Sequence, residues 1–246
     1  MKMRIIGIVA LLAASAAQAD GWSGKGEAGF LLSRGNAEST SANAKIDFAK
    51  ETGPWKNAVF FGGLYGKTGD LTSAQRLEAR YQLDHKLTDK MFWFGALRGE
   101  QDKFSGFAYQ ASLTTGVGYK FIDTDATKFT GTVGVGYARL RPQQLIKNAG
   151  GAVVDRIKGD TTGSAIATAG FNFEQRLTSN TKVIDKFLVE SGSKNTSTMN
   201  DLSIQVAMNE VLALSAGYGI HYNTKPAAGT KKIDQLTTLN LVYNFK

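Results

Sequence analysis

Most of the chain beyond residue 20 alternates between apolar residues and polar or small ones, with a period of two. The stretch from Thr114 to Leu140 reads TTGVGYKFIDTDATKFTGTVGVGYARL and contains Gly-Val-Gly-Tyr twice. On each side of the polar IDTDAT, valine, tyrosine and phenylalanine share one parity, and glycine, threonine and lysine share the other. Because successive side chains of a strand point to opposite faces, the stretch predicts two β-strands joined by a tight turn.

The same alternation recurs in about twelve segments of ten or more residues. One face of each segment is apolar and the other is polar or small, as expected for strands with lipid outside and a polar interior. The sequence therefore predicts an all-β fold: a single antiparallel transmembrane β-barrel of about twelve strands. An even number of strands is the rule for single-chain bacterial barrels.

The connections between these segments alternate in length. Short polar ones such as ETGPW, KLTDK and IDTDAT alternate with longer ones such as GKTGDLTS, EQDKFSGFA and the run 141–160. This alternation is typical of outer-membrane barrels, which have short periplasmic turns and longer external loops. All three prolines fall in predicted connections, as strand pairing requires: Pro54, Pro142 and Pro226.

The first residues carry an export signal. Lys2 and Arg4 precede an apolar run over residues 5–17, and Ala17-Gln18-Ala19 has the form of a cleavage site. We expect residues 1–19 to be a cleaved Sec signal peptide and residues 20–246 to be the barrel. With no other apolar run long enough for a spanning helix, the predicted location is the outer membrane of a Gram-negative bacterium.

Composition narrows the chemistry. The chain has no cysteine, which excludes disulfides and thiolate metal sites, and its formal net charge of +8 is scattered along the sequence. We expect no nucleic-acid partner, no cofactor and no bound metal. The expected partners are outer-membrane lipid and lipopolysaccharide, together with the barrel assembly machinery during insertion, and the expected state is a monomer.

Charged residues on the interior-facing parity are the candidate functional site. Seven of them form a possible charge patch in the lumen: Arg76, Glu78, Arg80, Arg98, Glu100, Lys120 and Lys128. Four more share that parity: Asp84, Lys182, Lys186 and Glu190. Interior charges need partners or water. They form either a self-neutralising plug or a polar channel that favours anions.

The two copies of Gly-Val-Gly-Tyr place their glycines on the same interior face as Lys120 and Lys128. We expect these glycines to leave free volume above the two lysines. The two segments contain no interior-facing carboxylate, so both lysines are expected to be unpaired.

The alternative function is a lipid-active, phospholipase-like enzyme of the outer membrane. Such an enzyme needs a histidine beside a nucleophile on the lipid-facing side. The only two histidines are His85, at a predicted strand end, and His221, on the interior parity. Their positions favour structural roles, so the sequence predicts a non-enzymatic envelope protein, either a structural barrel or a narrow, porin-like solute channel.

Several segments resemble the family of salt-induced outer-membrane proteins, and the resemblance covers essentially the whole mature chain. The segments that carry it are WSGKGEAGFLLSRGNAESTSANAKIDF, YQLDHKLTDKMFWFGALRGEQDKF, GVGYKF and the closing LNLVYNF. The resemblance implies an outer-membrane barrel without catalytic residues and a link to salt or osmotic stress. Assembly signals of such barrels commonly end on an aromatic residue, whereas here Lys246 follows Phe245.

Overall fold

The computed structural model describes residues 21–33, 39–69, 71–150, 152–226 and 230–245. These residues form thirteen strands, with the following bounds: β1 Trp22–Ser33, β2 Ser39–Thr52, β3 Trp55–Thr68, β4 Leu71–Lys86, β5 Met91–Asp102, β6 Phe107–Asp123, β7 Thr127–Lys147, β8 Val153–Lys158, β9 Thr162–Arg176, β10 Thr181–Gly192, β11 Thr196–Ala207, β12 Leu212–Asn223 and β13 Ile233–Phe245. No helical segment with the length and hydropathy of a membrane span occurs in these ranges. The predicted signal peptide, residues 1–19, lies outside the described residues.

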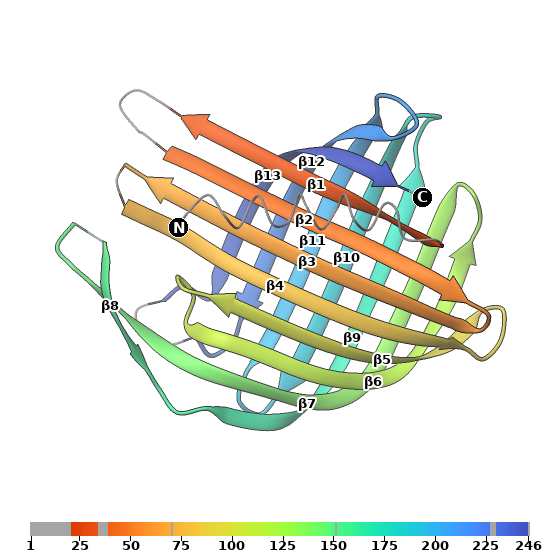
Figure 1. The fold of residues 1–246 in the computed structure, drawn as a ribbon. Coiled ribbons are helices and arrows are strands. Elements are labelled where there is room, and N and C mark those ends of the chain that lie inside the picture. The colour runs from red at the N-terminus through yellow and green to blue at the C-terminus, as the bar shows by residue number, and fades with distance from the viewer. Residues whose placement is uncertain (1–20, 34–38, 70, 151, 227–229, 246) are drawn as a thin grey trace.

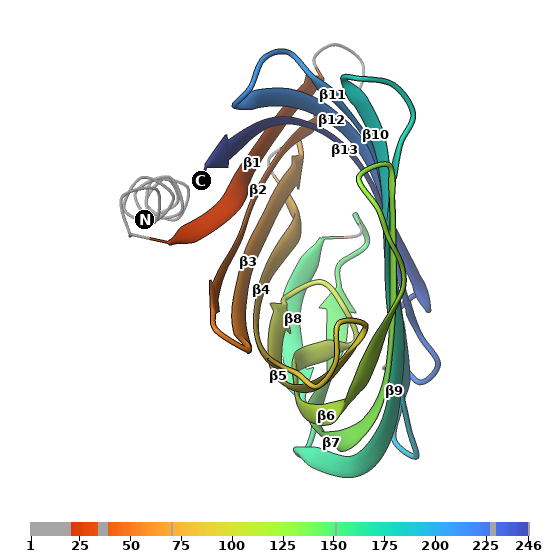
Figure 2. The same ribbon diagram turned by 90° about the vertical axis from the view of Figure 1, so that its right-hand side faces the viewer.

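Twelve of the strands close into a barrel. Each strand from β1 to β7 pairs antiparallel with the next, β7 pairs with β9, the strands β9 to β13 pair in order, and β13 pairs with β1 (Figure 1). In Figure 2 the strands β2–β4 face β9–β11 across the interior. A closed ring leaves no unpaired edge in the wall, which a strand-built membrane protein requires. The predicted all-β barrel of twelve antiparallel strands is confirmed.

Side chains of the two parities lie on opposite faces of the wall. The apolar parity is on the outside, where Val135 is 64% exposed and Leu239 is 68% exposed. The polar parity faces the interior, where Ser215 and Asn240 are each 4% exposed. The outer surface is therefore apolar, and the space enclosed by the wall holds polar and charged side chains.

The repeated glycines face the interior of two adjacent strands. Gly116 of β6 is the register partner of Gly134 of β7, and Thr124 accepts the amide hydrogen bond that closes the turn between these strands, from Thr127 N to Thr124 Oγ1 at 3.0 Å. The free volume expected above the glycines is not there. A Cβ atom on Gly118 would lie 2.1 Å from the ring of Phe92, so aromatic rings of β5 fill that space.

The predicted external connections differ most from the structure. The strands extend into the segments predicted as connections. For example, β3 ends at Thr68 and β4 begins at Leu71, so most residues of GKTGDLTS belong to strands. The run 141–160 is not a plain loop, because β7 continues to Lys147 and pairs with the short strand β8. This hairpin projects beyond the wall at the left of Figure 1.

Pro142 therefore lies inside a strand, contrary to the sequence prediction. It sits beside a register shift in the pairing of β6 with β7, where a missing amide hydrogen is tolerated. The next residue, Gln143, is only 2% exposed and donates from Nε2 to the carbonyl oxygens of Asp102 (2.9 Å) and Ser105 (3.0 Å). These bonds fasten the base of the hairpin to the connection between β5 and β6.

Candidate functional site

The middle of the lumen is occupied by Arg98 of β5. Its guanidinium lies 3.2 Å from Glu78 and 3.3 Å from Glu190, and it also pairs with Glu100. Glu190 belongs to β10 and accepts a second hydrogen bond, from Ser112 Oγ at 2.6 Å. Arg98, Glu100 and Glu190 are each 7% exposed. We call Arg98 and its three carboxylates the Arg98 network. It joins β4 and β5 to β10 across the lumen.

A second group of contacts lies nearer the loop end, around Arg76 of β4. Its Nε donates to Asp102 at 2.8 Å, and its terminal nitrogens lie 3.2 Å from His221 Nδ1 and 3.9 Å from Asp234. His221 and Asp234 belong to β12 and β13, so these contacts also cross the interior. Arg76 also lies 3.8 Å from Glu100, which links this group to the Arg98 network.

Arg80 completes the cluster on the turn side. It donates to Glu78 at 2.7 Å, and its guanidinium stacks 4.7 Å from the ring centroid of Phe60, a cation–π contact. The structure thus brings five of the seven predicted residues into one connected set: Arg76, Glu78, Arg80, Arg98 and Glu100. Each of their buried charges has an opposite charge beside it, the condition under which ions are retained in a poorly hydrated interior.

The sequence prediction missed two carboxylates that complete this set. Asp102 falls in EQDKFSGFA, which the sequence predicts as an external connection, and Asp234 lies at the start of the last strand. Glu190 has the interior parity in the sequence. Its segment, TKVIDKFLVES, shows the least regular alternation of apolar and polar residues, because Asp185 falls on the apolar face. In the structure Asp185 is on that outer face and accepts a hydrogen bond from Asn200 at 2.6 Å.

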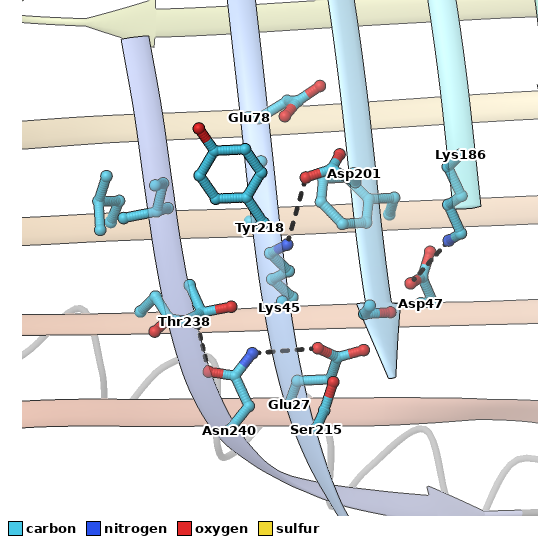
Figure 3. A pocket seen from close by; sticks show the side chains of 18 of the residues that line it. Glu27, Lys45, Asp47, Glu78, Lys186, Asp201, Ser215, Tyr218, Thr238 and Asn240 are labelled. Carbon is cyan, nitrogen blue, oxygen red and sulfur yellow. Dashed lines mark hydrogen bonds and ion pairs between the residues drawn. The ribbon is translucent and has the colours of Figure 1, made fainter. Parts of the chain in front are cut away.

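Beside the Arg98 network a narrow part of the lumen remains open. This side cavity of about 140 Å³ is lined by small residues such as Gly62, Ser203 and Gly217. Two ion pairs cross it, as Figure 3 shows: Lys45 of β2 with Asp201 of β11 (3.9 Å), and Lys186 of β10 with Asp47 of β2 (3.5 Å). All four side chains are 30% to 40% exposed, so these bridges are more hydrated than the contacts of Arg98.

A larger cavity of about 810 Å³ occupies the turn end of the barrel, which we call the vestibule. Its lining runs from the turn residues Pro54 and Asp89 inward to Arg98 and Glu190. The Arg98 network is therefore its floor. The vestibule and the side cavity share lining residues, so they are neighbouring parts of one polar interior: Lys25, Asp47, Phe60, Arg80, Ile184, Lys186 and Asp201.

Lys120 and Lys128, the other two predicted residues, line the vestibule and are separate from the Arg98 network. The expectation that both are unpaired is wrong for Lys120, whose Nζ lies 3.1 Å from Asp123 at the strand end. No ion pair joins Lys128 to a carboxylate within the described part of the chain. Both register partners of Lys128 are carboxylates that pair with other lysines: Asp123 of β6 with Lys120, and Glu174 of β9 with Lys182 at 3.1 Å.

One histidine lies inside the lumen and the other lies near the end of a strand. His221 is inside, beside Arg76, and the ring of His85 packs at a tilt against Trp55 with a ring-centroid distance of 4.3 Å. Over the residues that the structure describes, no group of three or more potential ligands is arranged to hold a metal ion. The chemistry that the described interior displays is ion pairing and hydrogen bonding between its own side chains.

The chain is similar in sequence and in fold to several known bacterial proteins. The chain is 25% identical over 223 residues to the "Uncharacterized protein YdiY" of Escherichia coli (strain K12), covering 88% of this chain and 81% of that protein. Its fold resembles the translocator domain of the autotransporter NalP from Neisseria meningitidis, with a TM-score of 0.52, 13% identity and coverage of 98% and 94% of the two chains. The β domain of the Bordetella autotransporter BrkA superposes with a TM-score of 0.45 at 13% identity, covering 92% and 98%.

The structure thus resembles bacterial outer-membrane β-barrels. The family model described as "Protein of unknown function, DUF481" matches residues 26–245, which is nearly the whole described barrel. The chain therefore belongs to the DUF481 family.

Proposed function

We propose that this protein is a structural, non-enzymatic barrel of a Gram-negative outer membrane, with a lumen held closed at mid-height. The observation that carries the proposal is the Arg98 network, in which one buried guanidinium joins carboxylates from three strands across the interior. The Arg98 network and the two ion pairs across the side cavity, Lys45–Asp201 and Lys186–Asp47, together block the passage with complementary charges. No apolar core of the kind that a soluble barrel would use is needed. The apolar outer face supports a lipid environment.

The partners belong to the same proposal. The lipid-facing surface would contact outer-membrane lipid and lipopolysaccharide, the barrel assembly machinery would insert the chain, and the barrel would act as a monomer. We further propose, from the family resemblance alone, a role under salt or osmotic stress. Growth of a deletion strain in high salt, with and without the restored gene, tests that role.

Solute entry into liposomes that contain the purified barrel tests the closed lumen. The proposal expects entry no faster than in protein-free liposomes for sugars and small ions. Rapid entry, at rates typical of open porins, would refute it. A phospholipid-hydrolysis assay on the same sample addresses the enzymatic alternative, since turnover by the parent protein would contradict a non-enzymatic role.

A narrow solute channel is the second candidate, favoured by the side cavity that runs beside the Arg98 network. Its cross-lumen bridges, Lys45–Asp201 and Lys186–Asp47, are partly hydrated and join long, flexible side chains. Opposite charges at such bridges separate at lower cost than a buried pair. This candidate predicts small conductance steps from the parent barrel, and those steps should change in size when Lys45 and Lys186 are replaced by glutamine.

A further inference from the structure

The wall of the vestibule formed by β5, β6 and β7 combines aromatic rings with lysines. Phe92 and Phe94 of β5 both line the cavity. Each ring lies against a glycine of β6: a Cβ on Gly118 would be 2.1 Å from Phe92, and a Cβ on Gly116 would be 2.9 Å from Phe94. The glycines let the two rings lie close to the strand backbone. Phe94 is only 5% exposed, so the half-buried ring of Phe92 supplies the apolar platform at the edge of the open space.

Three lysines surround this platform at the turn end: Lys90, Lys120 and Lys128. Lys90 and Lys120 are held together by the backbone, because Lys120 N donates to the carbonyl oxygen of Lys90 at 2.8 Å. Lys128 lies on β7, on the other side of the turn that follows β6.

Three of the carboxylates nearby already have cationic partners. Asp89 pairs with Lys86 at 2.8 Å, Asp123 with Lys120 at 3.1 Å, and Glu174 with Lys182 at 3.1 Å. Among the described residues no ion pair reaches Lys90 or Lys128, and both side chains are exposed. The platform is therefore bordered by two ammonium groups that form no ion pair within the described residues.

The size of the space suits a small molecule. A volume of about 810 Å³ lies in the range of ligand pockets, which combine apolar walls with a few placed polar groups. Thr130 and Thr132 add hydroxyl groups to the same wall of the vestibule. A ring on the ligand would lie on Phe92, and an anionic group would meet the lysines.

We propose that the vestibule is a binding site for small organic anions that carry an apolar ring. Charge supplies the attraction to Lys90 and Lys128, and the ring of the ligand packs on Phe92. Asp84, which also lines the vestibule and accepts a hydrogen bond from Gln82 at 2.7 Å, disfavours an anion on the β4 side. The ligand is thereby directed to the β5–β7 wall.

Isothermal titration of the full-length barrel in an uncharged maltoside detergent tests the site with benzoate as the probe. We expect benzoate to bind more tightly than acetate, benzylammonium not to bind, and benzoate affinity to fall as salt screens the lysines. The combined variant Lys90→Gln and Lys128→Gln should weaken benzoate binding about fivefold or more, given the usual strength of exposed charge contacts. The matched control, Lys147→Gln with Lys158→Gln on the distant β7–β8 hairpin, should bind as the parent does.

The Phe92→Leu variant separates the role of the ring from that of the charge. It should bring the affinities for benzoate and acetate together while leaving acetate unchanged. Absence of benzoate binding by the parent, equal affinity for benzoate and acetate, or unchanged binding in the double-lysine variant would each overturn the proposal. The measurement needs no transport, so its result is independent of whether the lumen conducts.

Discussion

Removing the charge of Arg98 should destabilise the barrel strongly. In the variant Arg98→Met, Glu78 keeps Arg80 at 2.7 Å and Glu100 keeps Arg76 at 3.8 Å, but Glu190 keeps only the hydroxyl of Ser112. One buried carboxylate thus loses its cation. Breaking a buried pair by removing one partner costs about 3–5 kcal/mol, and we expect the free energy of unfolding to fall by that amount.

Two further variants show whether this reasoning is right. Adding Glu190→Gln to Arg98→Met removes the orphaned charge and should recover about 1–3 kcal/mol. The control Lys56→Met removes a cation from the exposed pair with Glu51 (3.6 Å), where the side chains are 46% and 74% exposed, and should cost less than about 1 kcal/mol.

Equilibrium urea unfolding in phospholipid vesicles, followed by far-ultraviolet circular dichroism, measures all three variants. If Arg98→Met costs no more than Lys56→Met, the Arg98 network is hydrated rather than buried. If Glu190→Gln makes the Arg98→Met protein still less stable, the unpaired carboxylate is not the source of the loss.

Three other outcomes follow from the fold. Arginine at Ile204, which is 41% exposed on the outer face, should lower the free energy of unfolding in vesicles by roughly 2–4 kcal/mol, and arginine at Ser203, which lines the side cavity, should lower it less. Equal losses would show that the two side chains are assigned to the wrong faces of the wall. Gly118→Val should lower the free energy of unfolding by about 1–3 kcal/mol because the new side chain meets the ring of Phe92, while Gly99→Val, whose Cβ would meet no described residue beyond its chain neighbours within 4 Å, should change it little. Similar values for the two variants would mean that the Phe92 ring does not pack against Gly118. The mature protein should fractionate with the outer membrane and migrate differently on a detergent gel before and after boiling, and recovery in the soluble periplasm would contradict the barrel in the membrane.

The wall of the barrel was predictable from sequence because the alternation of apolar and polar residues within each strand is a local pattern. Alternation along one strand decides which side chains face out, so Val135 and Asn240 could be assigned without knowledge of their neighbours. Tight polar turns such as KLTDK and IDTDAT are equally local signals. The ends of the strands at the loop end were not predictable in this way, because pairing with a neighbour extends β7 through Pro142 to Lys147.

The interior depends on which strands face each other, and one segment does not contain that information. Parity placed Arg98 inside, but nothing near it in sequence identifies Glu190, 92 positions away, as its partner. The same limit explains the error at the glycines. Small residues on β6 suggested empty space, whereas Phe92 and Phe94 of the neighbouring strand fill it.

Closure of the lumen by the Arg98 network is the central claim, and planar-bilayer recording tests it most directly. The comparison is between the parent barrel and a variant with Arg98, Glu100 and Glu190 all replaced by alanine, which removes the contacts that Arg98 makes across the lumen together with their charges. The parent should show no sustained open state, and the variant should show repeated conductance steps. A parent barrel that conducts steadily, with steps as large as those of the variant, would contradict a lumen closed by these residues.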